Sequence, residues 1–250
     1  PVALPFDTVP MPSQRPPTID AVAAARWASR PLRPDDSRSP WLHEEVAQRM
    51  AERLDWITRR PAHWAHWGPL QGGLEGHERV ASRYPEASCH VVEADAERSR
   101  RAMERLAKPW WHPGRWRAAP VHAGLPPVGG VQMVWANMLL HQQADPQALL
   151  EQWRRALDVD GFLMFSCLGP DTVRELRAVY RALGWPAPAH DFTDMHDWGD
   201  MLVEAGFAEP VMDMERITLS FETPQRLLQE LRGLGRNLHP GRFAGLRGRA

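Results

Sequence analysis

The stretch that decides the fold runs from residue 131 to residue 168. It reads, in order, VQMVWAN (131–137), PQALLEQWRRAL (146–157), DVDG (158–161) and FLMFSCL (162–168). Apolar residues recur at three- and four-residue spacing in the second segment, which is typical of a helix. The first and last segments are almost uniformly apolar, as strands are when helices cover both faces of a parallel sheet. The order strand, helix, glycine turn, strand therefore predicts a right-handed crossover in an open α/β sheet.

Ligands of open α/β sheets bind at the carboxyl ends of the strands. Asn137 and the segment 166–169 follow the two predicted strands at such ends. We therefore expect both to lie near a ligand site.

Composition bounds the class of protein. The chain has 250 residues, of which 43% are hydrophobic and 24% charged, with a formal net charge of -1. These values suit one globular α/β domain and argue against a general nucleic-acid binder, because no global positive field would attract a polyanion. No apolar run reaches membrane-spanning length, and the two cysteines form no CxxC motif. We expect a protein of the reducing cytoplasm, without membrane or nucleic-acid partners.

Two parts of the chain differ in composition. Residues 1–40 are rich in proline and predict a partly flexible arm with a short helix at 21–30. Residues 41–250 predict the α/β domain, beginning with a helix at 41–59 and ending in an arginine-rich tail without acids at 231–250. Near the end of the domain, apolar residues alternate over 211–221, which predicts one or two antiparallel edge strands.

A glycine-rich turn lies where an α/β domain makes its first strand-to-helix connection. The sequence HWAHWGPLQGGLEG (63–76) contains Gly68, Gly72 and Gly73. Glycines let a backbone turn sharply and approach a ligand closely. The pattern is neither GxGxxG nor a Walker motif, so a plain turn and a cofactor loop both remain open.

Two acids follow the next strand, which is predicted at 90–92. Glu93 and Asp95 stand about 20 residues after the glycine turn, where a carboxylate can bind the hydroxyl pair of a ribose. The alternative for Asp95 is the N-cap of a helix at 96–107.

Five segments resemble the malonyl-[acyl-carrier protein] O-methyltransferase family of biotin synthesis. They are WLHEEV (41–46), ANMLLH (136–141), GPDTVREL (169–176), FTDMHDWGD (192–200) and GFAEPVMD (206–213). The similarity runs from about Trp41 to Arg249 and is more specific in the second half than in the first.

The resemblance implies a class I methyltransferase fold: a Rossmann-like, seven-stranded, mostly parallel sheet with one antiparallel strand and helices on both faces. It also implies S-adenosyl-L-methionine as the cofactor. The residues expected to bind it are Gly68, Gly72, Gly73, Glu93, Asp95 and Asn137. The methyl acceptor would be a carboxylate, on a carrier or on a small acid, and Arg174 and His196 are expected to bind it. The alternatives are a solvated helix residue for Arg174 and a hydrogen bond at a helix start for His196. No metal or covalent nucleophile is required, because the sulfonium methyl group is already activated.

The partner that the resemblance implies is an acyl carrier protein, which is acidic and could dock on the arginine-rich tail. The chain also departs from the family pattern. No Asp ends the first strand, Pro69 removes a backbone donor, and Gln132 stands where the family has an Asp. Two hypotheses follow: an active methyltransferase, or a degenerate relative that serves as a binding or assembly partner.

Overall fold

The computed structural model describes residues 19–31, 39–107 and 119–243. The helices are α1 (Ala21–Ala28), α2 (Trp41–Arg53), α3 (Pro69–Gly72), α4 (Leu74–Arg83), α5 (Ala96–Leu106), α6 (Pro146–Ala156), α7 (Arg174–Ala182), α8 (Met195–Glu204) and α9 (Pro224–Leu234). The strands are β1 (His63–Trp67), β2 (Ser88–Val92), β3 (Val121–Ala123), β4 (Val131–Ala136) and β5 (Leu157–Phe165). The predicted arm at 1–17 and the tail beyond residue 243 lie outside the described residues.

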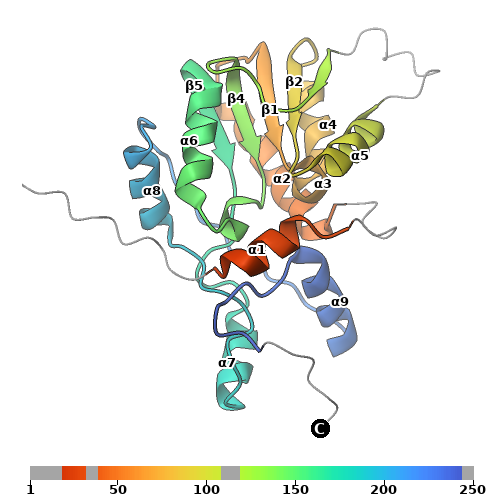
Figure 1. The fold of residues 1–250 in the computed structure, drawn as a ribbon, viewed down its shortest axis with the longest axis vertical. Coiled ribbons are helices and arrows are strands. Elements are labelled where there is room, and N and C mark those ends of the chain that lie inside the picture. The colour runs from red at the N-terminus through yellow and green to blue at the C-terminus, as the bar shows by residue number, and fades with distance from the viewer. Residues whose placement is uncertain (1–18, 32–38, 108–118, 244–250) are drawn as a thin grey trace, which may run out of the picture.

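The five strands form one sheet in the order β3-β2-β1-β4-β5, and every neighbouring pair is parallel. The chain first builds outward from β1 to β3 and then restarts beside β1 with β4. The boundary between β1 and β4 is therefore the topological switch point, where a doubly wound sheet binds its ligand. Figure 1 shows helices on both sides of this sheet. The predicted parallel α/β architecture is confirmed.

Side-chain alternation along the strands divides the core into two clusters. In β1, Trp64 packs in one cluster while Ala65 and Trp67 pack in the other. In β4, Trp135 joins Trp64, and Val134 joins Ala65. Both faces of the central strands are therefore buried, which explains why these strands are almost uniformly apolar.

The turn predicted at residues 158–161 interrupts β5 instead of preceding it. Val131 pairs with Leu157, and Met133 pairs with Phe162, so the residues between form an irregularity in the ladder. Asp160 has a positive φ of 60° there. The backbone turns where the sequence predicted, but Leu157 already belongs to the strand.

The prediction of seven strands with an antiparallel edge is wrong for the residues described. Residues 211–221 form no strand, although Ile217, Leu219 and Phe221 are half-buried and their neighbours exposed. Acidic side chains of this segment pair instead with α2, where Arg53 contacts Asp213 and Arg49 contacts Glu215. Alternation fixes which side chains face inward, but a strand also needs a neighbouring backbone for its hydrogen bonds.

Helix α1 lies near the carboxyl ends of the strands, and α7 and α9 project beyond it (Figure 1). Trp27 and Ala24 of α1 pack against Leu238, which follows α9. The backbone N–H of Asp20 donates to the carbonyl of Leu238 over 2.8 Å, and the Asp20 carboxylate pairs with Arg242. The beginning and the end of the described chain thus form one small lobe beside the ligand-binding edge of the sheet.

Candidate nucleoside site at the strand ends

The chain turns sharply after β1 and enters two helices in succession. Gly68 has φ 66° and is the N-cap of α3, and Gly73 has φ 133° and separates α3 from α4. Residues with a Cβ rarely adopt these backbone angles, so glycine is required at both positions. The predicted glycine turn is present, directly at the carboxyl end of β1.

The backbone N–H groups of this turn all bond within the protein. Five of them donate to backbone carbonyls: Gly68 to Val92, Gln71 and Gly72 to Gly68, Gly73 to Pro69, and His77 to Gly73. The other four donate to side chains: Leu70 to Glu93, Leu74 to the Ser39 hydroxyl, and Glu75 and Gly76 to Glu44. Anion-binding loops leave several such donors directed at the ligand. This turn therefore holds its own chain together and does not form a cradle for phosphate or carboxylate.

Two of the predicted glycines are needed for close packing inside the protein. A Cβ at Gly72 would lie 2.7 Å from the carbonyl oxygen of Asn137, and one at Gly73 would lie 2.9 Å from the carboxylate of Glu44. Both contacts join the turn to neighbouring elements, β4 and α2. Whether Gly68, Gly72 or Gly73 also contacts a cofactor stays a prediction.

Glu93 follows β2 directly and lies beside the glycine turn. Its Oε1 accepts the N–H of Leu70 over 2.9 Å. Burial raises the pKa of Glu93 to about 7, an effect that the hydrogen bond from Leu70 opposes. A largely dry carboxyl group at the tip of β2 suits a nucleoside, because it can accept hydrogen bonds from the two ribose hydroxyls. The residues present thus fit the ribose half of the expected cofactor.

Asp95 performs the alternative role that the sequence left open. Its side chain accepts the N–H of Arg98 over 2.8 Å and caps α5. A further role for Asp95 in cofactor binding stays a prediction.

Asn137 joins three segments at the carboxyl end of β4. It is 1% exposed, and its amide nitrogen donates to the carbonyls of His43 and Gly72. Its amide oxygen accepts the hydroxyl of Ser166, which follows β5, over 2.6 Å. In the structure Asn137 positions the strand ends and the glycine turn, and direct cofactor contact stays a prediction.

Sequence reasoning missed Gln142, which connects α1 with the glycine turn. Its side-chain oxygen accepts the indole N–H of Trp27 over 2.7 Å and lies 3.5 Å from the amide nitrogen of Gln71. Its own amide nitrogen lies 3.5 Å from the carbonyl oxygen of Leu234, at the end of α9. A glutamine after a strand carries no sequence signal for such a role, because its partners come from three distant segments.

The structure places the two predicted substrate residues on exposed helix starts. Arg174 bonds its neighbour Glu175 over 2.9 Å, and His196 bonds Asp194 over 2.6 Å at the start of α8. Within the described part of the chain, no hydrogen bond or ion pair joins either residue to the glycine turn, Glu93 or Asn137. Their role in substrate binding stays a prediction.

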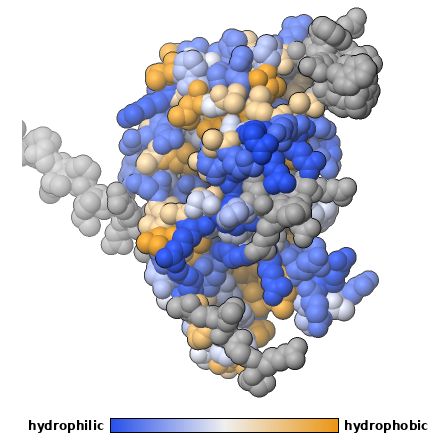
Figure 2. Space-filling view, turned by 45° about the vertical axis from the view of Figure 1, so that its right-hand side comes forward, coloured by the Kyte–Doolittle hydropathy of each residue, from blue (hydrophilic) through white to orange (hydrophobic). Residues whose placement is uncertain are grey.

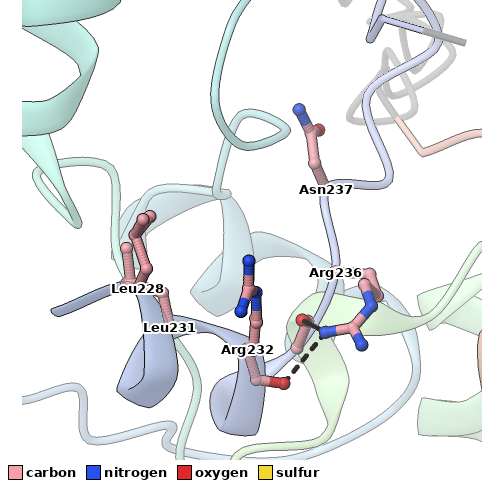
Figure 3. A pocket seen from close by; sticks show the side chains of 6 residues that line it. Leu228, Leu231, Arg232, Arg236 and Asn237 are labelled. Carbon is pink, nitrogen blue, oxygen red and sulfur yellow. Dashed lines mark hydrogen bonds between the residues drawn. The ribbon is translucent and has the colours of Figure 1, made fainter. Parts of the chain in front are cut away.

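A hollow of about 340 Å³ lies beside α9, separate from Glu93. Its lining consists of Leu228, Leu231, Arg232, Gly235, Arg236 and Asn237 (Figure 3). Among the described residues, no group of acids, histidines and cysteines could hold a metal ion, and no helix is long and apolar enough to cross a membrane.

The site therefore consists of a close-packed glycine turn, a half-buried carboxyl group after β2 and the switch point of a parallel sheet. This combination defines the class of protein as a Rossmann-like α/β protein with a candidate nucleoside site at its switch point. No family model matches the chain.

Curated relatives identify the family. The chain is 38% identical over 239 residues to the malonyl-[acyl-carrier protein] O-methyltransferase of Gallionella capsiferriformans, covering 93% of this chain and 81% of that protein. It is 40% identical over 224 residues to the protein of the same name from Laribacter hongkongensis, covering 85% and 73%. The chain belongs to the malonyl-[acyl-carrier protein] O-methyltransferase family.

Solved structures resemble the chain more distantly. The structure described as PigF with SAH has a TM-score of 0.49 at 16% identity, covering 70% of this chain and 54% of that one. The cyclase SpnF has a TM-score of 0.48 at 16% identity, with 68% and 60% covered.

Proposed function

We propose that this chain methylates the free carboxylate of a malonyl group carried on an acyl carrier protein, with S-adenosyl-L-methionine as methyl donor. The observation that carries the proposal is the 38–40% identity to relatives with this name, over at least 73% of their length. By the family resemblance, the product would enter the synthesis of the biotin precursor.

For this reaction the protein mainly has to align the acceptor carboxylate with the methyl group of the cofactor and to exclude water. The cofactor supplies a methyl group already activated by its sulfonium centre. A malonyl carboxylate is ionised at neutral pH and needs no general base. Glu93 would hold the ribose, and the hydrogen bond from Trp27 to Gln142, which also reaches Gln71, holds α1 beside the glycine turn.

The glycine turn limits how the cofactor is held. Since its N–H groups bond internally, binding depends on Glu93 and on apolar contacts at the switch point. Each missing charge-assisted hydrogen bond lowers binding by roughly 1.5–3 kcal/mol. We therefore expect a lower affinity than in relatives that keep an acid at the end of the first strand.

The cellular setting belongs to the same proposal. Cys89 is a buried free thiol and Cys167 is free and half-buried, so neither forms a disulfide. Free thiols suit the reducing cytoplasm, where we place this protein.

The test is a transfer assay with radiolabelled S-adenosyl-L-methionine and malonyl-loaded acyl carrier protein. We expect label to enter the carrier fraction as a base-labile methyl ester. Acetyl-loaded carrier, which lacks the free carboxylate, should accept none. Absence of transfer, together with a flat calorimetric titration at millimolar S-adenosylhomocysteine, would favour the binding-partner hypothesis.

A further inference from the structure

The hollow beside α9 combines positive charge with apolar walls. From Thr223 to Phe243 the chain carries Arg226, Arg232, Arg236 and Arg242 against the single acid Glu230. This segment is thus positive in a chain whose formal net charge is -1. Figure 2 shows hydrophilic surface at the lower right, beside a strip of hydrophobic surface. Leu228, which lines the hollow, is 46% exposed.

Two arginines of the hollow differ in how they are held. Arg236 is fixed: its Nη1 donates to the carbonyls of Arg232 and Gly235 over 2.9 Å each, and its guanidinium lies 5.0 Å from the centre of the Trp27 ring. Arg232 is exposed and forms no ion pair with any described carboxylate. An anion entering the hollow would thus meet a fixed positive charge and an adjustable one.

The hollow is connected to the strand ends through Gln142. A Cβ on Gly235, which lines the hollow, would lie 3.6 Å from the amide nitrogen of Gln142. The same side chain reaches Gln71 of the glycine turn. Gln142 thus lies between the hollow and the glycine turn.

We propose that this hollow binds the phosphodiester of the phosphopantetheine arm of the carrier, with Arg232 as the ligand of the phosphate and Arg236 as a second positive charge. The proposal rests on the proposed function and adds where the substrate arm enters. The phosphodiester at one end of the arm is anionic and matches the two arginines, whereas the largely uncharged pantetheine chain matches Leu228 and Leu231. The hollow is of the size of small-ligand pockets, about 300–1,000 Å³.

The first experiment compares Arg232→Gln with the matched control Arg226→Gln. Arg226 lies on the same helix, bonds Gln229 and does not line the hollow. We expect Arg232→Gln to raise KM for malonyl-loaded carrier about tenfold with kcat unchanged. The variant removes a contact to the arm that stabilises the bound substrate and the transition state equally. The control should stay within about twofold of the wild type. Equal KM values for both variants would overturn the proposal.

The second experiment measures binding directly and identifies what the hollow recognises. Phosphopantetheine should compete with holo acyl carrier protein, whereas pantetheine, which lacks the phosphate, should not. The apo carrier, without the arm, should bind more weakly than the holo carrier. Competition by pantetheine equal to that of phosphopantetheine, or equal binding of apo and holo carrier, would contradict phosphate recognition.

These outcomes separate the two proposals. If the wild type transfers methyl groups and Arg232→Gln behaves like Arg226→Gln, only the docking site is wrong. If the wild type transfers none, the function is wrong, and the competition by phosphopantetheine still decides the site.

Discussion

At the scale of single residues, the most informative group is the carboxyl of Glu93. It ends β2, accepts one backbone N–H, and has a pKa raised to about 7 mainly by burial. When this carboxyl group is ionised it destabilises the fold, and its oxygens can accept hydrogen bonds from a ligand.

We expect Glu93→Gln to stabilise the protein at pH 8 relative to the wild type, by about 2 kcal/mol, and to have little effect near pH 4.5. The folded-state pKa is raised, so the folded form binds more protons between pH 4.5 and 7. The wild type therefore loses stability as the pH rises through that window. Urea midpoints of both proteins at pH 4.5, 6 and 8 measure the difference.

The same variant tests the ribose role, because a neutral amide accepts hydrogen bonds more weakly than a carboxylate. S-adenosylhomocysteine should bind at least tenfold more weakly to Glu93→Gln, by calorimetry at pH 8. Unchanged affinity there, together with a loss for Asp95→Asn, would assign the ribose to the other acid.

A second residue-scale prediction concerns the buried pair His66 and His77. Their Nδ1 atoms lie 3.2 Å apart, so one ring donates and the other accepts. Burial lowers both pKa values, that of His77 to about 4. Unfolded histidines take up protons below pH 6.5, so this stability is present above that pH and is lost as the pH falls toward 4.

We expect His66→Leu/His77→Leu to weaken this acid dependence between pH 7 and pH 4 by at least about 3 kcal/mol, the contribution that His77 alone makes. His63→Gln serves as control, because His63 is exposed and bonds the uncharged hydroxyl of Ser88. Urea midpoints across this range report the result. A double variant as acid-sensitive as the wild type would locate the sensitivity in His43 or His141, which are also buried.

At the scale of elements, α2 and α4 pack together so closely that only glycine fits at their crossing. A Cβ on Gly76 would lie 2.6 Å from the Cβ of Ala47. Glu44 of α2 also accepts the N–H groups of Glu75 and Gly76 at the start of α4. The position of the glycine turn therefore depends on the fit between these two helices.

We expect Gly76→Ala to destabilise the protein by about 2 kcal/mol, because the helices must separate. The double variant Ala47→Gly/Gly76→Ala should show favourable coupling of at least about 0.5 kcal/mol, measured by a double-mutant cycle in urea. Gly233→Ala on α9 is the matched control, since a Cβ there meets nothing within 4 Å. Additive effects in the cycle would mean that the contact does not limit the packing.

At the scale of the whole molecule, the distribution of charge matters more than its sum. The chain has 30 basic and 31 acidic residues, yet its segment from Thr223 to Phe243 is positive, and Leu238 of this segment packs against α1. A neutral protein can thus still attract an acidic partner to one face.

We expect KM for the malonyl-loaded carrier to rise with salt, because charges separated by more than about 8–10 Å are screened near 0.1 M ionic strength. Arg232→Gln should reduce the slope of log KM against log salt concentration. Steady-state assays from about 50 to about 300 mM NaCl, a range over which salt screening increases, measure both slopes. A slope shared by wild type and variant would place the electrostatic contact elsewhere.

Local sequence patterns determined much of the architecture. Near-continuous apolar runs predicted β4 and the later part of β5, and helical spacing predicted α6. These signals suffice because periodicity and capping act within a few residues. The glycine turn was also correctly placed, since positive φ angles restrict residue choice locally.

Tertiary structure alone decided what those elements do. The internal bonding of the glycine turn, the three partners of Asn137 and the bridge formed by Gln142 each join segments far apart in the sequence. The same reason explains the missing edge strand at 211–221, whose alternation was visible but whose neighbour was not. A sequence states which groups a residue offers, whereas the packing of distant segments decides which partner each group meets.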